Sequence, residues 1–415
     1  MASAGEGEGK RVLIVVQNLP VPFDRRVWLE ATTLAQAGYQ VSVICPKAKG
    51  FNASFEHLDG VDIYRYHLPV DADGALGFVL EFVWCFIRTA MKAVRVATRG
   101  RGFDVVHLCN PPETYWPLAY VCKWFGKRVI FDHHDLSPEM YMAKFDGGNP
   151  RVARFLLFLE RMTFRVADVV ITTNESHKRI AMERGRVVPD DIYIVRSGPD
   201  LKRFASYPSD PSWRQGKRYA LAYLGEICVQ DGVDNLVRAV RILRDDFGRD
   251  DFHCVFIGGG PHQPAIKEYA DEQGVADVCT FTGRVSDEEL CRALSSVDVG
   301  VDPDPKNDWS DKSTMNKIIE YMYFGLPVAA FDLTEHRFSA QGAARYAEPN
   351  SEQDLARVIA ELLDDADARQ RLGQLGRDRV HNELAWDYSA PVLLDAYAAA
   401  LGLHRPAAPS STLGA

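Results

Sequence analysis

The sequence lacks the features that define several classes of protein. Its eight cysteines are scattered, without a CxxC pair or a repeated spacing, which excludes a disulfide framework and a cysteine zinc site and fits free thiols in a reducing cytoplasm. Positive charge is not in excess: the net charge of −9 argues against a protein that binds nucleic acid through its phosphates. Residues 1–9 contain no apolar stretch for a secretory signal, and the longest apolar run, residues 76–87, is too short to cross a bilayer. We therefore expect a soluble, cytoplasmic protein.

Short apolar segments alternate with helical patterns along most of the chain, and 415 residues with 47% hydrophobic content can fill two domain cores. The predicted strands lie at residues 11–16, 40–45, 61–66, 105–108, 128–132, 169–172, 192–195, 219–224, 253–257, 278–281, 299–301, 328–331 and 344–346. The clearest predicted helices lie at residues 25–37, 151–166, 234–246, 264–273, 288–295, 316–324 and 351–364. This alternation predicts an α/β fold of two tandem Rossmann-like, doubly wound domains, with ligands at the carboxyl ends of the strands in an interdomain cleft.

A stretch rich in proline, serine and aspartate, without periodicity, marks the expected connection between the two domains. We predict a flexible N-terminus at residues 1–9, a first domain at 10–205, a linker at 206–217, a second domain at 218–385, a C-terminal helix at 386–402 that returns to the first domain, and a disordered tail at 403–415.

Residues 311–328 have the pattern of a short helix followed by a strand, with Ser313 or Thr314 as the expected N-cap and Gly325 as the expected stop. A helix start gathers unpaired N–H groups and a partial positive charge, which suits a phosphate. Lys317 would add a full charge in the first turn, and Glu320, one turn further on, could hold sugar hydroxyls. An ordinary helix of an α/β domain has the same pattern, so both interpretations stay open.

The loop at residues 17–26 joins the first strand to the first helix, the usual phosphate corner of a doubly wound domain, but it lacks a GxGxxG. Arg25 and Arg26 open the helix instead. Arginine at a helix N-terminus is repelled by the helix dipole, which costs roughly 0.3–1 kcal/mol of stability. An arginine kept at this cost indicates a function, such as contact with an anionic donor or acceptor. Surface arginines paired with Asp24 or Glu30 explain the same residues equally well.

Two further loops invite a ligand. The glycine run that begins at Gly258 follows a predicted strand and fits either a phosphate cradle or a tight turn. The DPDP segment at residues 302–305 has two carboxylates but no histidine or third carboxylate at ligand spacing, so we predict no metal there.

The order of the motifs resembles that of family 4 glycosyltransferases with the GT-B fold, over about residues 11–397. The motifs that carry the resemblance are FDRRVW at residues 23–28, DHHD at 132–135, RSGPD at 196–200, YLG at 223–225 with GVD at 232–234, FIGGG at 256–260, FTGRV at 281–285, and KIIEYM at 317–322 with GLPV at 325–328. Each motif is weak alone. Their number and their order along the chain make the resemblance.

The resemblance implies a retaining, metal-independent transferase that moves a sugar from a UDP- or GDP-linked donor, with no other cofactor. The acceptor would be a saccharide, a lipid-linked molecule or a small molecule, as in the synthesis of cell-surface polysaccharides, glycoconjugates or natural products. The first domain would face the acceptor and the second would bind the nucleotide sugar. Without a metal, backbone amides, a helix dipole and basic side chains must stabilise the charge on the leaving diphosphate.

The resemblance also assigns residues to the donor. The amides of Thr314, Met315 and Asn316 would bind the phosphates, and Glu320 matches the glutamate that holds the ribose. The backbone of two further residues would face the nucleobase, and two glycines would border the nucleotide: Arg284 and Val285, and Gly225 and Gly258.

The departures from the family pattern concern charge. Lys312 stands where the family has its first glutamate, and Glu226 and Asp231 stand in place of its basic pair. The diphosphate must therefore find other cations, of which the nearest candidates are Lys312, Lys317, Arg25 and Arg26. We expect Lys317 to take the main role, because it answers no evident packing requirement and lies at a helix start. The lost glutamate leaves the identity of the donor sugar open.

In the first domain, His133, His134 and Asp135 follow a predicted strand. The resemblance aligns His134 with the histidine that contacts the donor sugar, where it would orient and stabilise instead of acting as an obligatory base. Asp135 could fix the tautomer of His134 or bind the acceptor. A loop with a helix cap supplied by Asp135 or Ser137 accounts for the same segment.

Two basic and aromatic stretches raise the question of a membrane. Residues 76–101 are apolar first and then basic, and residues 151–165 mix arginines with phenylalanines and leucines. Either stretch suits a helix lying on an anionic membrane surface or a helix packed on a sheet with an arginine-rich outer face. The first interpretation would make a lipid-linked acceptor and a peripheral position at the inner membrane surface plausible.

Two other functions fit the same residues. A nucleotide-sugar epimerase of the same fold would use carboxylates and histidines without an acceptor, and the altered residues at positions 226, 231 and 312 are compatible with an inactive nucleotide-binding module. The sequence does not fix the nucleobase, the sugar, the acceptor or the oligomeric state.

Overall fold

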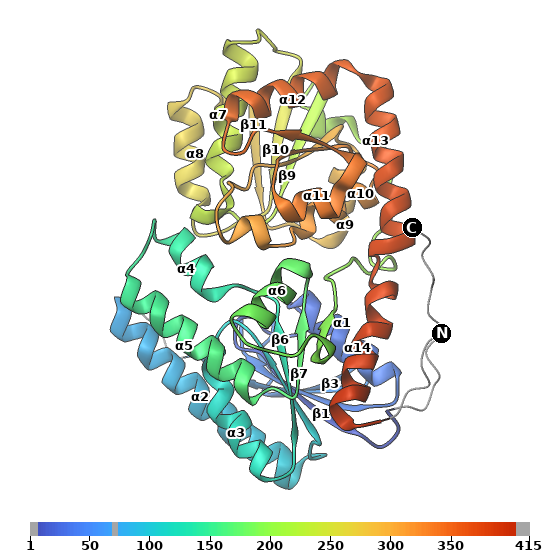
Figure 1. The fold of residues 1–415 in the computed structure, drawn as a ribbon. Coiled ribbons are helices and arrows are strands. Elements are labelled where there is room, and N and C mark those ends of the chain that lie inside the picture. The colour runs from blue at the N-terminus through green and yellow to red at the C-terminus, as the bar shows by residue number, and fades with distance from the viewer. Residues whose placement is uncertain (1–6, 69–73, 404–415) are drawn as a thin grey trace. The chain divides into compact units, whose positions relative to one another are not determined.

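The computed structural model describes residues 7–68 and 74–403, which form two compact units (Figure 1). Unit 1 comprises Met1–Pro138, Asn149–Arg196 and Ser389–Ala415, and unit 2 comprises Glu139–Gly148 and Ser197–Tyr388. Each unit is built on a sheet of mainly parallel strands that alternate with helices along the chain, which confirms the predicted α/β fold. Among the described residues, no helix is both long enough and apolar enough to cross a membrane.

The sheet of unit 1 has the strand order β3-β4-β2-β1-β5-β6-β7-β8, and only β3 runs antiparallel to its neighbour. Its strands are β1 Arg11–Val15, β2 Gln40–Pro46, β3 Phe55–Leu58, β4 Val61–Tyr66, β5 Val105–Cys109, β6 Arg128–His133, β7 Val169–Thr172 and β8 Ile192–Ile194. Its helices are α1 Arg25–Gln36, α2 Gly74–Arg99, α3 Trp116–Trp124, the start of α4 Ser137–Lys144, α5 Pro150–Val166 and α6 Glu175–Glu183.

The two faces of the unit 1 sheet are covered by different helices. Side chains alternate along a strand, so Val106 and Leu108 of β5 pack into the core under α2, α3 and α5, while His107 points to the opposite face. There the His107 Nδ1 atom lies 2.7 Å from the hydroxyl of Tyr397 in α14 (Trp386–Leu401), so the last helix packs on this sheet. Helices α2, α3 and α5 lie side by side in Figure 1 and meet at the short turn Glu113–Tyr115.

The sheet of unit 2 has the order β11-β10-β9-β12-β13-β14, with all pairs parallel. Its strands are β9 Tyr219–Leu224, β10 Phe252–Ile257, β11 Cys279–Gly283, β12 Val299–Asp302, β13 Val328–Phe331 and β14 Ala344–Ala347. Its helices are α7 Val233–Asp245, α8 Gln263–Glu272, α9 Asp287–Leu294, α10 Asn316–Tyr323, α11 Thr334–Ala340, α12 Glu352–Asp364 and α13 Ala366–Arg379. The carboxyl ends of parallel strands gather at one edge of each sheet, where ligands bind in doubly wound folds.

The predicted strands are all present, and the elements that the sequence did not reveal have weak patterns. Strand β3 is a short edge strand with exposed positions, so it carries little hydrophobic signal. Helix α3 is apolar around most of its circumference, and α13 contains two glycines and few apolar residues. Helices α6 and α11 are short. Helices that are short or poor in apolar residues carry little of the 3.6-residue pattern on which the prediction of helices depends.

Candidate active site

Asp132 lies near the end of β6, on the face of the unit 1 sheet that α1 covers. Arg26, in the first turn of α1, donates to both of its carboxylate oxygens, with an Nη2–Oδ1 distance of 2.7 Å and an Nε–Oδ2 distance of 2.9 Å. The Arg26 guanidinium also lies 3.2 Å from Glu30 and donates to the carbonyl of Val195 at 2.9 Å. All three charged side chains are buried. One alternative from the sequence was that the arginines pair with Asp24 or Glu30 on the surface. Arg26 does pair with Glu30, but the pair is buried inside the unit.

His134 follows directly after β6, and its position is fixed twice. Its Nδ1 atom lies 2.8 Å from the Asp132 Oδ2 atom, and its backbone N–H donates to the side-chain oxygen of Asn110 at 2.9 Å. The side chain of His134 remains 17% exposed at the carboxyl edge of the sheet. The partner of Nδ1 is Asp132 and not Asp135, and binding of the acceptor by Asp135 stays a prediction. The Asp135 carboxylate accepts a hydrogen bond from the N–H of Leu136.

The electrostatics of this group favour a charged histidine. Burial alone would lower the pKa of His134, but the charge of Asp132 and the hydrogen bond between them raise it above its ordinary value. Burial alone would raise the pKa of Asp132, yet the charges of Arg26 and His134 hold it well below its ordinary value. Burial and the charge of Asp132 raise the pKa of Glu30 to about 7. Asp132 is therefore ionised at neutral pH, and its charge favours the protonated form of His134.

Sequence reasoning missed most of the residues that support this histidine. Asp132 directly precedes the two histidines and belongs to the DHHD motif, which could have identified it. Glu30 lies one helical turn after Arg26, and its Oε2 atom is 3.7 Å from His107 Nε2. His107 and its partner Tyr397 are 290 positions apart in the chain, so no spacing in the sequence joins them.

The ligand atoms of Glu30, His107, Cys109 and Asp132 lie within 4.8 Å of one another, which is a composition that could hold a metal ion. The guanidinium of Arg26 already contacts the two carboxylates of this group at 3.2 and 2.7 Å. A protein cation thus balances the acidic charge of the group.

In unit 2, Lys317 points into a buried acidic cluster at the carboxyl end of β12. Its Nζ atom lies 2.9 Å from Asp304 Oδ2 and 3.4 Å from Asp302 Oδ1, and 5.0 Å from the centre of the Tyr223 ring. The Lys317 side chain is 11% exposed. The premise that Lys317 answers no packing requirement is therefore wrong, because it balances two buried carboxylates. Its predicted contact with the phosphates stays a prediction.

The acids of this cluster outnumber its lysine. Burial alone would lower the pKa of Lys317, but Asp302 and Asp304 raise it well above its ordinary value. Burial and the neighbouring charge of Asp302 raise the pKa of Asp304 well above its ordinary value, whereas Lys317 keeps the pKa of Asp302 low in spite of burial. Lys317 therefore contacts both carboxyl groups of the cluster, and Asp302 is the more acidic of the two.

His336 completes this cluster and was missed by the sequence. Its Nε2 atom lies 3.5 Å from Asp302 Oδ2, and its Nδ1–H donates to the carbonyl oxygen of Phe331 at 3.0 Å. The sequence showed no histidine near the DPDP segment at ligand spacing. In the structure, α11 brings His336 next to that segment. Asp302, Asp304 and His336 have a composition that could hold a metal ion, but the ammonium group of Lys317 contacts both carboxylates.

Helix α10 begins at Asn316, as predicted, but its N-cap is Met315 and not Ser313 or Thr314. Ser313 donates its hydroxyl to the carbonyl of Trp309 and closes the preceding turn instead. No side chain caps the helix start, and its first turn contains no acidic residue. A start of this kind presents backbone N–H groups and the positive end of the dipole. The predicted stop is confirmed: the helix ends at Tyr323, and Gly325 has a φ of 71°.

The glycine loops after β9 and β10 pack backbone against backbone. A Cβ atom on Gly258 would lie 1.9 Å from the carbonyl oxygen of Gly225, and Gly258 has a φ of 129°. The N–H of Gly258 donates to the carbonyl of Gly283 at 3.0 Å. Close approach of these loops therefore explains the glycines. Gly225 lies over the cluster, since a Cβ atom there would be 3.5 Å from Lys317 Cε.

The other predicted donor residues lie on unit 2 loops and on α10. Lys312 precedes the helix and pairs with the exposed Asp308 at 3.4 Å. Glu320 is half-buried. Burial alone would lower the pKa of the nearby Arg203, but Asp287 and, to a smaller extent, Glu320 raise it. Arg284 is exposed, and Val285 packs against the core. Their roles toward a donor stay predictions.

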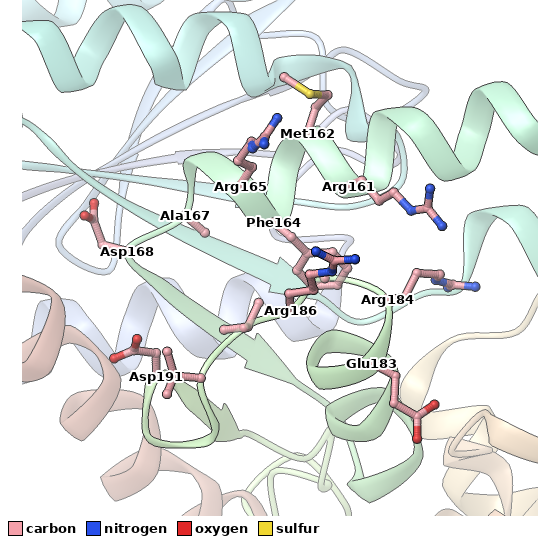
Figure 2. Close-up of a pocket in the computed structure, with 13 residues that line it drawn as sticks. Arg161, Met162, Phe164, Arg165, Ala167, Asp168, Glu183, Arg184, Arg186 and Asp191 are labelled. Atoms are coloured by element: carbon pink, nitrogen blue, oxygen red, sulfur yellow. The ribbon is translucent and has the colours of Figure 1, made fainter.

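A cavity of about 630 Å³ lies elsewhere in unit 1, between the end of α5 and the segment that follows α6 (Figure 2). Its charged lining residues are Arg161, Arg165, Asp168, Glu183, Arg184, Arg186 and Asp191. None of the predicted site residues lines this cavity.

Comparison with known proteins decides the family. The model of the glycosyl transferase 4-like domain matches residues 24–198, and that of the glycosyl transferases of group 1 matches residues 218–365. The chain belongs to glycosyltransferase family 4. Its fold is the GT-B fold, and it is a glycosyl-transferring enzyme of the EC 2.4 type, as the sequence predicted.

Individual relatives of this glycosyltransferase are distant. An MMP alpha-(1->4)-mannosyltransferase from Mycolicibacterium hassiacum is 27% identical over 75% of this chain and 74% of its own length. A GDP-mannose-dependent alpha-(1-6)-phosphatidylinositol monomannoside mannosyltransferase from Mycobacterium tuberculosis is 29% identical over 54% of this chain and 60% of its own. The structure of a sucrose-phosphate synthase from Thermosynechococcus elongatus superposes with a TM-score of 0.76 at 18% identity, over 95% of this chain and all of that one, which shows a shared fold.

Proposed function

We propose that this glycosyltransferase transfers a sugar from a nucleotide-sugar donor to a saccharide, lipid-linked or small-molecule acceptor, with retention at the anomeric carbon and without a bound metal ion. The observation that carries the proposal is the ammonium group of Lys317 among Asp302, Asp304 and His336. In this position a protein cation contacts both carboxylates at the carboxyl end of β12, which supports a transfer without a bound metal ion.

In unit 2, the start of α10 would bind the donor diphosphate. The amides of Met315 and Asn316, with Thr314 before them, supply donors at an uncapped helix start. Lys317 would act mainly through position: its pairing with Asp302 and Asp304 ties the first turn of α10 to the end of β12. Hydrogen-bond donors that are already oriented stabilise a developing negative charge without reorganisation.

Other unit 2 residues would set donor recognition. Glu320 would hold the ribose, and the backbone at Arg284 and Val285 would face the nucleobase. Lys312 is a partly exposed cation before the helix, paired with Asp308 at 3.4 Å, and would add positive charge near the diphosphate. One of the relatives is named for GDP-mannose, so GDP-linked hexoses stand beside UDP-linked ones as the first donors to test.

In unit 1, His134 would contact the reacting sugar. The bond between sugar and phosphate breaks with positive charge on the sugar and negative charge on the leaving phosphate, which accepts the acceptor's proton in a retaining transfer. A His134 that Asp132 keeps protonated would donate a hydrogen bond to an oxygen of the donor and would not remove the acceptor's proton. Asp132 and Arg26 are positioning residues in this scheme.

The test is incubation with a panel of UDP- and GDP-linked hexoses, with and without simple sugar and polyol acceptors. Nucleotide release that rises with an acceptor, and a product whose anomeric configuration by NMR equals that of the donor, would support the proposal. An isomerised nucleotide sugar without free nucleotide would indicate an epimerase instead. Neither product, together with nucleotide binding, would indicate an inactive binding module.

A further inference from the structure

Helix α2 presents an apolar stripe to solvent. Leu80, Val83, Ile87, Met91 and Val94 follow one another at spacings of three and four residues, so they share one face of the helix. Each is at least 49% exposed. The opposite face of the same helix, with Cys85, Ala93 and Val96, is buried in the core of unit 1. A helix on the surface of a globular domain ordinarily carries polar side chains on its outer face. This apolar stripe therefore indicates an interaction surface.

The two neighbouring helices extend this surface. On α5, the exposed face carries Phe155 and Phe158 between Arg151, Arg154 and Arg161. Helix α3 packs against α5 and ends in two very exposed aromatic side chains, Trp124 and Phe125, at 73% and 74%. The three helices lie side by side over one face of the unit 1 sheet (Figure 1). We call the outer faces of α2, α3 and α5 the α2–α3–α5 surface.

The charge of this surface is predominantly positive, with the half-buried Glu81 of α2 as an exception. The three helices carry nine lysines and arginines against two glutamates, in a chain whose net charge is −9. Of the two glutamates, Glu160 is buried and pairs with Arg184, so it does not reach the surface. The basic residues are Arg88, Lys92, Arg95, Arg99, Lys123, Arg151, Arg154, Arg161 and Arg165. Basic and apolar side chains therefore share the same outer faces.

We propose that the α2–α3–α5 surface docks unit 1 on an anionic lipid bilayer. Apolar side chains at helix outer faces enter the boundary between headgroups and acyl chains, and the surrounding lysines and arginines meet the lipid phosphates. Their long stems allow the charged ends to reach the headgroups while the methylenes stay among the apolar side chains. Trp84 and Trp124 add the amphipathic aromatic rings that favour a membrane interface.

Charge complementarity favours a bilayer over a second copy of this chain. Two copies that met through this surface would bring positive faces together and bury them, which is unfavourable. Unit 2 supplies a comparison within the same protein. Its exposed large apolar residues are dispersed over different elements, for example Phe247 after α7, Phe338 in α11 and Leu375 in α13. Single exposed apolar residues of that kind are ordinary and need no partner.

The experiment is co-sedimentation of the full chain with vesicles of phosphatidylcholine alone or mixed with phosphatidylglycerol, without donor or acceptor. We expect the protein to pellet with the mixed vesicles, with an affinity about tenfold or more above that for phosphatidylcholine, and to be released by added salt. Because no turnover is measured, the result is independent of the proposed transferase reaction.

Two variants locate the contact. The triple variant Ile87→Ser, Met91→Ser and Phe155→Ser removes apolar side chains from exposed positions and should reduce vesicle binding about tenfold or more, with an unchanged midpoint of thermal unfolding. The double variant Phe247→Ser and Leu375→Ser is the matched control on unit 2 and should bind like wild type.

Three results would overturn the proposal. One is a wild-type protein that stays in the supernatant with both kinds of vesicle. Another is equal loss of binding in the two variants. The third is a wild-type dimer in light scattering that the triple variant dissociates, since a second copy would then cover the surface. Quenching of tryptophan fluorescence by brominated lipid, reduced in Trp124→Phe, tests the same contact without removing the stripe.

Discussion

The two units carry buried ion clusters of similar composition at the carboxyl edges of their sheets, yet the clusters end differently. In unit 1, a buried arginine holds Asp132, and Asp132 in turn holds His134, which remains 17% exposed. In unit 2, Lys317 is the centre of its cluster and is 11% exposed, with carboxylates on two sides. The first cluster presents a titratable side chain at the edge of the sheet, and the second fixes the start of a helix.

This difference teaches that a basic residue at a helix start has no fixed meaning. Arg26 and Lys317 both lie in the first turn of a helix, and each pairs with an aspartate at the end of a strand, Asp132 and Asp302. Buried pairs of this kind are costly to break, because the remaining partner is left without a counter-charge. The proposed function therefore gives the contact with substrate to His134 and to the amides of α10, and a positioning role to Arg26 and Lys317.

The largest expected effect is on stability, in unit 2. Lys317→Met leaves Asp302 buried without a cation and should lower the free energy of unfolding by about 3–5 kcal/mol, measured by urea denaturation. The matched control Lys312→Met removes a partly exposed pair with Asp308 and should cost about 0–1 kcal/mol. If the two variants were equally stable and only Lys317→Met lost nucleoside diphosphate binding, Lys317 would contact the nucleotide directly. The difference proposed between the two clusters would then be wrong.

The second expected effect is on catalysis, in unit 1. His134→Gln keeps a side chain that can donate to Asp132 but cannot carry a charge, and should lower turnover by about 10²-fold or more. Stability should change little, because the side chain lies at the edge of the sheet. The measurement is nucleotide release at saturating donor. Turnover near that of wild type would show that the unit 1 cluster is structural, as its counterpart in unit 2 is.

The third expected effect is on pH dependence. The raised pKa of His134 keeps the ring protonated to a higher pH than a free histidine, so turnover should fall as the pH rises through that raised pKa. Asp132→Asn removes the charge that raises it, and the fall should move to lower pH. The profile of kcat, taken over the range in which circular dichroism shows both proteins folded, tests the shift. An alkaline limb at the same pH in both proteins would exclude His134 as its source.

The sequence predicted the fold well because the fold depends on local periodicity. Every predicted strand is present, and the stop of α10 at Gly325 is a local property of glycine with positive φ. The position of His134 at the end of β6 also followed from strand and motif. These features need only neighbouring residues.

The partners inside the site could not be predicted, because they come from distant parts of the chain. His336 reaches Asp302 only through the path of α11, and Tyr397 reaches His107 across 290 positions. The burial of Lys317 was hidden for the same reason, since the two aspartates that surround it precede it by 15 and 13 positions and lie on another element. A charged residue in a motif has the same appearance in a sequence whether it faces a ligand or a buried counter-charge.

The most direct measurement is the rate of nucleotide release from the active donor in excess EDTA, repeated after Mg²⁺ is added. A leaving diphosphate that is stabilised by helix amides and protein cations requires equal rates in the two conditions. A rate that is lost in EDTA and recovered with Mg²⁺ would contradict this mechanism, because a divalent ion would then carry the charge assigned here to the start of α10.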